Sequence, residues 1–403
     1  MWEAIASNER RSWLLISLMG ALLVAFGGVI GLYVDPQVGG YFGVAVAAAL
    51  WLILWATAAG ACDSILLNSV KAREISKEDA PQLWNIVEEM TIASGLGQMP
   101  KVYVMDDPTL NAFAVGHNPK RAAVAVTSGL LKRLSRDELQ GVIGHELGHI
   151  RNLDVRFMTL VSVMVGAIVL ISHGFLRGMF GGGGGRRGSS NGGGQAQLIF
   201  LAIAILLAIL APLAAQLLYF SCSRRREFLA DASSARFTRY PEGLAAALEK
   251  IAGQAAVQKD VNRVVAPLYI VNPLQGRAAF SPFSTHPPTE ERIRILRGMA
   301  GAGYAAYQAA FQQVHGAGAR CIGEVTLKAD AVAALRTPTV EPATREQAVA
   351  RAQQVGQLLD RVINYAVIPC ACGVRLKVPP GFKRDTLTCP RCGREHAVPQ
   401  PGK

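Results

Sequence analysis

The chain has 403 residues, of which 51% are hydrophobic and 17% charged, and its formal net charge is +12. This length allows two or three compact units, and the apolar content is high for a soluble protein with so few charges. Because no surface pattern of interleaved basic and aromatic residues supports nucleic-acid binding, the positive charge indicates attraction to anionic lipid.

Four apolar runs without Asp, Glu, Lys or Arg lie at residues 13–33, 36–62, 157–176 and 198–220. Each is long enough to cross a bilayer as a helix of about 20 residues. One such run is also typical of a buried core helix, but four together predict four transmembrane helices in two hairpins. The first run has no small-residue cleavage site before a polar start, so we expect a retained span rather than a signal peptide.

Basic residues beside these runs predict the orientation, because Lys and Arg favour the cytoplasmic side. With two hairpins, most of them fall on one side of the membrane: Arg10, Arg11, Lys71, Arg73, Lys77, Arg151, Arg156, Arg224, Arg225 and Arg226. Only the loop that holds Arg177, Arg186 and Arg187 disagrees. We therefore expect a multi-pass protein of the cell (inner) membrane whose segments around residues 151 and 223 face the cytoplasm.

Outside the apolar runs, residue spacing predicts short helices and strands. Helices are expected over 80–93, 223–237, 241–256, 289–299 and 345–363, and strands over 102–105, 111–116 and 122–127. Ser135 followed by Asp137 and Glu138 is typical of an N-cap with acids in the first turn, so a further helix begins there and reaches about Ile150. Residues 181–194 are rich in glycine and predict a flexible connector.

The helix that begins after Ser135 carries the string His145-Glu146-Leu147-Gly148-His149. Two His at positions i and i+4 project from one face of a helix a single turn apart, so both imidazoles can reach one metal with Glu146 beside them. Two core histidines or a non-catalytic metal site are the alternatives, and both leave Glu146 without a task. The pattern therefore predicts a zinc peptidase site.

Three glycines, Gly141, Gly144 and Gly148, lie on the same helix between an apolar stripe and the His face. Glycine inside a helix costs about 1 kcal/mol relative to alanine, so three of them require a reason. We expect this glycine face to let a second helix, which bears the third ligand, pack close to the metal.

Catalytic zinc usually has three protein ligands and one position for water. The candidate for the third ligand is Glu227, and Asp231 lies four residues later on the same helical face. An acid there can accept a hydrogen bond from the free ring N–H of a zinc-bound His. Asp154, soon after the zinc helix, is a second candidate for that task. An ordinary solvated helix after a membrane span is the alternative for this segment.

These motifs, in this order, resemble the HtpX-type membrane metalloproteases, which are related to the zinc-dependent prenyl-protein proteases. The matching stretches are Asn111-Ala-Phe-Ala114, His145-Glu-Leu-Gly-His-Ile-Arg-Asn152 with Asp154, Arg226-Glu-Phe-Leu-Ala-Asp231, and Ser284-Thr-His-Pro287 with Glu291-Arg292-Ile293. Together they cover roughly residues 5–300. The resemblance implies that His145, His149 and Glu227 bind zinc and that Glu146 is the catalytic base.

The resemblance also implies residues that contact the substrate. Asn111, with Ala112 and Phe113 on the same strand, and His286 are expected to contact the substrate backbone. As a catalytic residue, His286 is also expected to help the zinc offset the oxyanion charge. A substrate strand that adds beside residues 111–116 would pair through its main chain, which is indifferent to side chains. Such pairing suits a protease that accepts unfolded segments.

Four of the seven cysteines cluster near the C-terminus, as Cys370 with Cys372 and Cys389 with Cys392. Four thiolates in two close pairs can complete a tetrahedral structural zinc site, so the segment resembles a zinc ribbon that folds on its metal. The first pair has one intervening residue where two are usual, which leaves His396 as a possible substitute ligand. Substrate capture, protein docking, nucleic-acid contact and a purely structural role all remain open for this segment.

The sequence therefore predicts a mainly α membrane protein with a gluzincin-like α+β catalytic domain and a small zinc ribbon. Its segments are hairpin 1 (1–67), the first catalytic part (68–156), hairpin 2 (157–220), the second catalytic part (221–300), a mixed helical connector (301–362) and the ribbon (363–403). The expected function is zinc-dependent cleavage of misfolded or membrane proteins at the cytoplasmic face. Specific processing of a lipidated or membrane-anchored peptide, and a non-catalytic zinc-binding membrane adaptor, are the alternatives.

Overall fold

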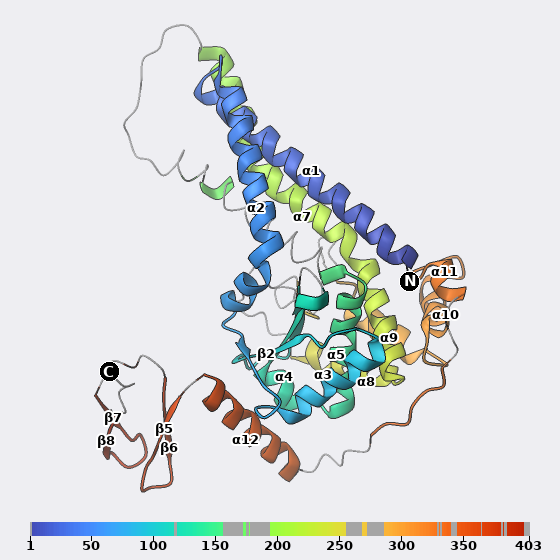
Figure 1. The fold of residues 1–403 in the computed structure, drawn as a ribbon, viewed down its shortest axis with the longest axis vertical. Helices are drawn as coiled ribbons and strands as arrows, with labels where there is room; N and C mark the ends of the chain where they lie inside the picture. Colours follow the sequence, from blue (N-terminus) through green and yellow to red (C-terminus); the bar gives the residue numbers. More distant parts are fainter. Residues whose placement is uncertain are drawn as a thin grey trace.

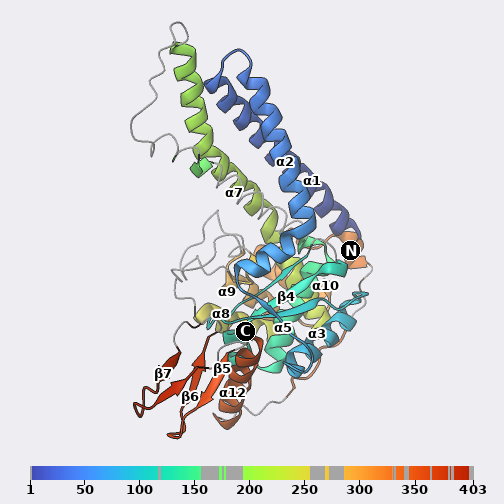
Figure 2. The same ribbon diagram turned by 60° about the vertical axis from the view of Figure 1, so that its left-hand side comes forward.

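The computed structural model describes most of the chain in three parts: a bundle of long helices, a catalytic α+β domain and a C-terminal pair of β-hairpins (Figures 1 and 2). The described residues are 2–116, 119–155, 172–174, 177, 194–254, 268–271, 286–328, 330, 333–339, 345–363, 365–379, 382 and 385–398. Most of the third apolar run, and residues Ser284 and Thr285 of the Ser-Thr-His-Pro motif, lie outside them.

Two apolar helices form the N-terminal hairpin, α1 (Trp2–Val34) and α2 (Gly39–Ser69). Their segments Ile16–Val34 and Gly39–Ala56 are long and apolar enough to cross a membrane. A side chain at Gly31 would collide with the Gly39 carbonyl oxygen at 2.0 Å. Small residues at a helix interface allow this close approach, which is typical of packing between membrane helices.

The long helix α7 (Gly194–Thr238) runs from beside α1 down into the catalytic domain, as both views show. The fourth apolar run and the helix expected over 223–237 are therefore one continuous element, whereas the sequence suggested two. The described residues show two apolar helices that meet the length for a span, and the apolar stretch of α7 described there, Leu201–Leu210, is shorter.

A four-stranded sheet forms one layer of the catalytic domain, with strand order β1-β2-β4-β3. The strands are β1 (Arg73–Glu74), β2 (Lys101–Met105), β3 (Ala112–Val115) and β4 (Ala123–Thr127), and a 3-10 turn (Pro119–Arg121) precedes β4. β4 is parallel to β2 and antiparallel to β3. Because β3 is last in the strand order, it is an edge strand. Every residue of β3 and β4 is buried, which indicates that both faces of the sheet are covered.

Helices pack around this sheet: α3 (Pro81–Ser94), α4 (Ser128–Arg133), α5 (Arg136–Arg151), α8 (Pro241–Gly253) and α9 (Thr289–Arg297). The side chain of Ser135 accepts a hydrogen bond from the Glu138 backbone N–H, and the Glu138 carboxylate accepts one from the Ser135 N–H. This capping box fixes where α5 begins, as the sequence predicted. The expected strands and the helices over 80–93, 241–256 and 289–299 are confirmed to within three residues.

The C-terminal segment continues onto the catalytic domain through α10 (Tyr304–His315), α11 (Glu324–Lys328) and α12 (Arg345–Val362). Tyr304, Tyr307 and Phe311 of α10 belong to the same buried cluster as the sheet and α5. The apolar stripe of α12, which includes Val355 and Leu358, packs against α4. Two hairpins follow, β5 (Ala366–Pro369) with β6 (Arg375–Val378) and β7 (Thr386–Thr388) with β8 (Glu395–Ala397). They lie at the end of the molecule away from the apolar hairpin (Figure 1).

Candidate active site

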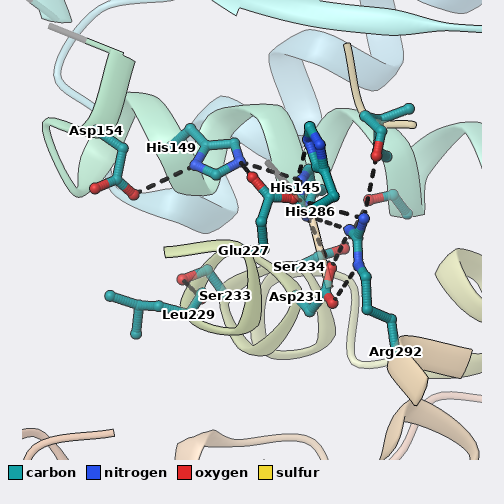
Figure 3. A network of polar contacts seen from close by, with 12 residues as sticks. His145, His149, Asp154, Glu227, Leu229, Asp231, Ser233, Ser234, His286 and Arg292 are labelled. Atoms are coloured by element: carbon teal, nitrogen blue, oxygen red, sulfur yellow. Dashed lines mark hydrogen bonds and ion pairs between the residues drawn. The ribbon is translucent and has the colours of Figure 1, made fainter. Parts of the chain in front are cut away.

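Helix α5 presents His145 and His149 on one face, as the i, i+4 spacing predicts. Their rings meet edge to face, and the two Nε2 atoms are 3.1 Å apart. Leu139, Ile143 and Leu147 on the opposite face are buried in the hydrophobic core, so the helix cannot rotate the pair away. The histidines therefore face the partner helix α7 (Figure 3).

Helix α7 brings the carboxylate of Glu227 to the same point. Glu227 Oε1 is 3.4 Å from His149 Nε2, and Oε2 is 3.6 Å from His145 Nε2. Among the described residues, these three form a group whose ligand atoms all lie within 4.8 Å of one another. Tetrahedral zinc with bonds of about 2.0–2.2 Å places its ligand atoms roughly 3.4 Å apart. The spacing of the three side chains fits that geometry.

The second oxygen of Glu227 supports a cation at this position. Glu227 is buried, and its Oε2 has no hydrogen-bond partner within the described part of the chain. Nη1 of Arg292 lies 3.5 Å from this oxygen and supplies part of the positive charge that a buried carboxylate needs, and a bound metal ion would supply more. Burial alone would raise the pKa of Glu227, but the nearby His286, His145 and His149 lower it well below the usual range. The side chain is therefore an anion, as a metal ligand must be.

The glycine face of α5 makes this approach possible, as the sequence predicted. A Cβ at Gly148 would lie 3.0 Å from Ser233 Cβ and 3.3 Å from the Ala230 backbone, both on α7. A Cβ at Gly144 would lie 3.1 Å from Ser234 Oγ. Gly141 instead approaches α8, where a Cβ would collide with Leu244 N at 2.6 Å. Glycine therefore sets the short distance between α5 and the two helices that follow.

Each histidine has a carboxylate on its other ring nitrogen. Asp231 Oδ1 lies 2.9 Å from His145 Nδ1, and Asp154 Oδ2 lies 3.3 Å from His149 Nδ1 (Figure 3). Both acids are fully buried. A carboxylate that accepts from Nδ1–H leaves the Nε2 lone pair free for a metal. The structure thus places both sequence candidates, Asp231 and Asp154, where such a task requires them.

Glu146 lies on α5 next to the first His and is 2% exposed. Burial raises its pKa, and the positive charge of the histidine pair and a hydrogen bond with the Ala114 backbone offset part of the rise. Ala114 belongs to the edge strand β3. The side chain of Glu146 therefore stands between the metal ligands and the strand expected to bind substrate.

The residues expected to contact substrate lie at the site, but they already have partners within the chain. His286 Nε2 is 3.5 Å from Glu227 Oε2. The Asn111 side chain donates to the Val271 carbonyl at 2.9 Å, and the Ala112 carbonyl accepts from Ile270 N at 3.0 Å. Part of the β3 edge is thus covered by residues of the chain itself, which the sequence did not predict. Phe113 is buried and meets Tyr269 edge to face.

Arg292 on α9 was missed as a site residue, although it belongs to one of the quoted motifs. It is fully buried and contacts Asp231, His145 and Glu227. A local signal exists, because Ile295 and Leu296 follow it at i+3 and i+4 on the buried side of the helix. An arginine on an apolar helical face requires a buried acidic partner.

The four C-terminal cysteines converge as the sequence predicted. Cys370 Sγ is 3.4 Å from Cys392 Sγ, and Cys372 Sγ is 3.6 Å from Cys389 Sγ. Tetrahedral zinc with Zn–S bonds of about 2.3 Å separates its sulfur atoms by roughly 3.8 Å. His396 is not part of this group of potential ligands. The residues fit a four-thiolate structural metal site that links the two hairpins.

The HExxH helix and the glutamate from a following helix together define a zinc metallopeptidase. The family model for peptidase family M48 matches residues 77–300. The chain is 45% identical over 298 residues to a protease HtpX homolog of Dictyoglomus turgidum, covering 74% of this chain and 94% of that protein. For the protease HtpX homolog of Streptococcus gordonii the identity is 40% over 300 residues, with 74% and 100% covered.

The chain belongs to peptidase family M48 and, within it, to the HtpX group of zinc metallopeptidases. The resemblance drawn from the sequence motifs is thereby confirmed. A crystal structure of S. mikatae Ste24p is also similar, with a TM-score of 0.39 and 19% identity over 73% of this chain and 67% of that chain. The family match ends at residue 300, so α10, α11, α12 and the cysteine group lie beyond it.

Proposed function

We propose that the protein is an endopeptidase that cleaves unfolded or misfolded segments of proteins at the cytoplasmic membrane surface, in the service of protein quality control. The observation that carries the proposal is the convergence of His145, His149 and Glu227, of which His145 and Glu227 are buried, with Glu146 beside them and an edge strand next to them. A non-catalytic zinc-binding adaptor would have no use for Glu146. Processing of one lipidated or membrane-anchored peptide remains the second candidate, because the same site would serve it.

The three ligands would hold a zinc ion that lowers the pKa of a water molecule and polarises the scissile carbonyl. Glu146 accepts the proton of the attacking water and then delivers it to the leaving amine. Its buried position suits both steps, because burial raises the pKa of the Glu146 carboxyl and so favours proton uptake from the water. His286, beside Glu227, is placed to offset negative charge on the former carbonyl oxygen.

The edge strand β3 supports a preference for extended, unfolded substrate. In the antiparallel pair with β4, Phe113 faces Ala125 and Ala114 faces Val124. Neighbouring residues along a strand direct their N–H and C=O groups to opposite sides. Ala112 and Ala114 therefore direct these groups to one side of β3, and Phe113 directs its own to the other. A substrate strand that pairs with Ala114 beside Glu146 is bound through its main chain, whatever its side chains are.

Membrane anchoring by α1 and α2 agrees with their length and apolar character. We propose that residues 157–176 and the apolar half of α7 supply two further spans, which gives four in all. The α5 half and the α7 half of the site then lie on the same side of the membrane, because the third span leaves that side and the fourth returns to it. The flanking basic residues favour the cytoplasm for this side. Labelling of single cysteines at positions 10 and 191 with a membrane-impermeant reagent tests this orientation.

The decisive test compares wild type with Glu146→Gln, purified in detergent with zinc. We expect the variant to bind zinc like wild type and to lose cleavage of an unfolded soluble protein by a factor of about 10²–10⁴. Glu324→Gln, at a glutamate whose side chain is 60% exposed, is the matched control and should cleave normally. Undiminished proteolysis by pure Glu146→Gln protein would contradict the mechanism. Cleavage of a lipidated peptide but of no unfolded protein would favour the second candidate.

Zinc stoichiometry tests the cysteine group separately. We propose two zinc ions per chain, one at the histidine pair and one held by Cys370, Cys372, Cys389 and Cys392. Cys389→Ser should reduce the zinc content from about two to about one per chain. A content of one in wild type that the Cys389→Ser substitution does not change would show that the cysteines hold no zinc.

A further inference from the structure

Arg292 is the most deeply buried cation near the site, with 0% of its side chain exposed. A guanidinium taken out of water is costly unless charged and polar partners satisfy it. Its hydrogen-bond acceptors lie on two segments of the chain, α7 and the segment 268–271, and Nη2 also lies 3.4 Å from Nδ1 of His145 on α5.

Two of its nitrogens hold Asp231. Arg292 Nε donates to Asp231 Oδ2 at 2.8 Å, and Nη2 donates to Oδ1 at 2.7 Å. This two-pronged pair is the strongest form of contact between a guanidinium and a carboxylate, and it fixes the carboxylate plane. Because Arg292 only donates, Asp231 stays an acceptor and its Oδ1 receives His145 Nδ1–H at 2.9 Å. The Nε2 atom of His145 then keeps its lone pair for the metal.

The third nitrogen reaches the segment Leu268–Val271, which we call the strap. Arg292 Nη1 donates to the Ile270 carbonyl at 3.1 Å, and Ile270 N donates in turn to the Ala112 carbonyl on β3 at 3.0 Å. Asn111 holds the next residue of the strap through the Val271 carbonyl. Leu268, Tyr269 and Ile270 are all buried. The strap therefore covers the β3 edge at Ala112, two residues before Ala114, whose backbone contacts Glu146.

We propose that Arg292 is a positioning residue with two tasks, to orient His145 through Asp231 and to hold the strap that ends the substrate strand at Ala112. The first task governs zinc affinity, and the second governs how much of an extended peptide pairs with β3. This inference rests on the proposed zinc site, and it adds a residue and a specificity boundary to it. Lysine cannot perform both tasks, because a single ammonium has no planar fork to hold two carboxylate oxygens and the Ile270 carbonyl together.

Zinc affinity, measured by chelator competition on the detergent-solubilised full chain, tests the first task. Arg292→Lys and Arg292→Met should bind zinc about 10–100-fold more weakly, the loss typical when a hydrogen-bond partner of a ligating histidine is removed or released. The visible spectrum of the cobalt(II)-loaded protein should change as well, because the His145 ring is no longer fixed. Arg297→Met is the matched control, since Arg297 lies on the same helix and pairs only with the exposed Glu242 and Glu249 among the interactions the structure describes.

A double variant keeps the test decisive if Arg292→Met does not fold. Asp231→Asn combined with Arg292→Met removes both buried charges together and so leaves neither one unpaired. If Arg292 acts through Asp231, the double variant binds zinc about as well as Asp231→Asn alone. A further ten-fold loss in the double variant, or wild-type zinc affinity and cobalt spectrum in Arg292→Lys, overturns the first task. Absence of zinc binding by wild type itself would instead refute the proposed function.

Peptide length tests the second task. Wild-type KM should be the same for two unfolded peptides that differ only by residues extending past Ala112, because the strap excludes them. Ile270→Pro has no N–H to donate to Ala112, so it and Arg292→Lys should lower KM for the longer peptide several-fold relative to the shorter one. Ile270→Pro should keep wild-type zinc affinity, which separates the two tasks. An unchanged length dependence in Ile270→Pro overturns the role of the strap.

Discussion

Replacing each glycine of α5 by alanine, one at a time, tests whether the glycine face sets the distance between the zinc-binding helices. Each replacement gains about 1 kcal/mol of helix propensity. Against this gain stands the cost of the added Cβ, typically about 1–3 kcal/mol when a packed interior is overfilled. The outcome at each position depends on what the Cβ meets and whether that neighbour can move.

The three positions differ in this respect. At Gly141 the Cβ would meet backbone atoms of α8, Leu244 N at 2.6 Å and its Cα at 2.8 Å, so α8 itself must shift. We expect Gly141→Ala to destabilise the fold by ~1–2 kcal/mol net. At Gly144 the nearest atom is Ser234 Oγ at 3.1 Å and the backbone is 3.4 Å away. The gain and the cost then cancel, so Gly144→Ala should change stability little.

Gly148 should show its effect on zinc rather than on stability. It precedes His149, and its Cβ would meet Ser233 Cβ at 3.0 Å and the Ala230 backbone at 3.3 Å. Ala230 precedes Asp231 on α7, so a shift of a few tenths of an ångström there separates the two halves of the ligand set. We expect zinc affinity to fall on the order of ten-fold, similar to the loss of a contact that orients a ligand.

The assay is thermal unfolding of the detergent-solubilised variants with and without zinc, together with chelator competition. Gly144→Ala serves as the internal control, because it adds the same methyl group to the same helix. A Gly141→Ala protein more stable than wild type would refute the packing argument. A Gly148→Ala protein with wild-type zinc affinity would show that the spacing of α5 and α7 does not control the site.

Two further predictions concern protonation and the C-terminal segment. Burial alone would lower the pKa of His149, but Asp154 and Glu227 raise it to about 10. His149 is then protonated at pH 8 in the metal-free protein, so zinc binding should release about one proton from it. The release is measured as a binding enthalpy that depends on the buffer. Because the pKa of His149 is higher in the folded protein, its protonation stabilises the metal-free fold. This stabilisation is complete below pH 6.5 and disappears as the pH rises through about 10. A metal-free protein that is equally stable at pH 6 and pH 10 would contradict this role of His149. In the C-terminal segment, Arg336 donates to Asp137 on α5 at 2.8 Å and to the Thr238 carbonyl at the end of α7 at 3.1 Å. Arg336→Met should therefore lower the free energy of unfolding by ~1–2 kcal/mol. Arg320→Met is the control and should change it little, because Arg320 and its partner Glu324 are exposed.

Local sequence patterns determined much of the catalytic domain. The i, i+4 spacing of His145 and His149 and the capping box at Ser135 depend only on neighbours within one helix, so they could be recognised without knowledge of the fold. Glu227 and Asp231 followed the same rule on a second helix. Even the close packing of α5 was indicated locally, because three glycines at one helical face are costly unless another helix approaches.

Other features were decided by tertiary structure alone. The fourth apolar run and the helix expected over 223–237 join in the single helix α7, whose later part packs against α5. The pairing of Ile270 with Ala112 joins residues far apart in the chain, and no local period marks it. The sequence predicted a free β3 edge for substrate; the fold covers part of that edge with the strap.

The same contrast applies within the site itself. The sequence by itself predicted the three ligands and the base, because metal ligation needs particular side chains at fixed helical spacings. Only the tertiary structure showed that Arg292 joins the ligand set to the strap, since its partner Asp231 lies 61 residues away. A buried arginine is defined by its surroundings, and burial arises from the packing of α5, α7 and α9 together rather than from any one of them.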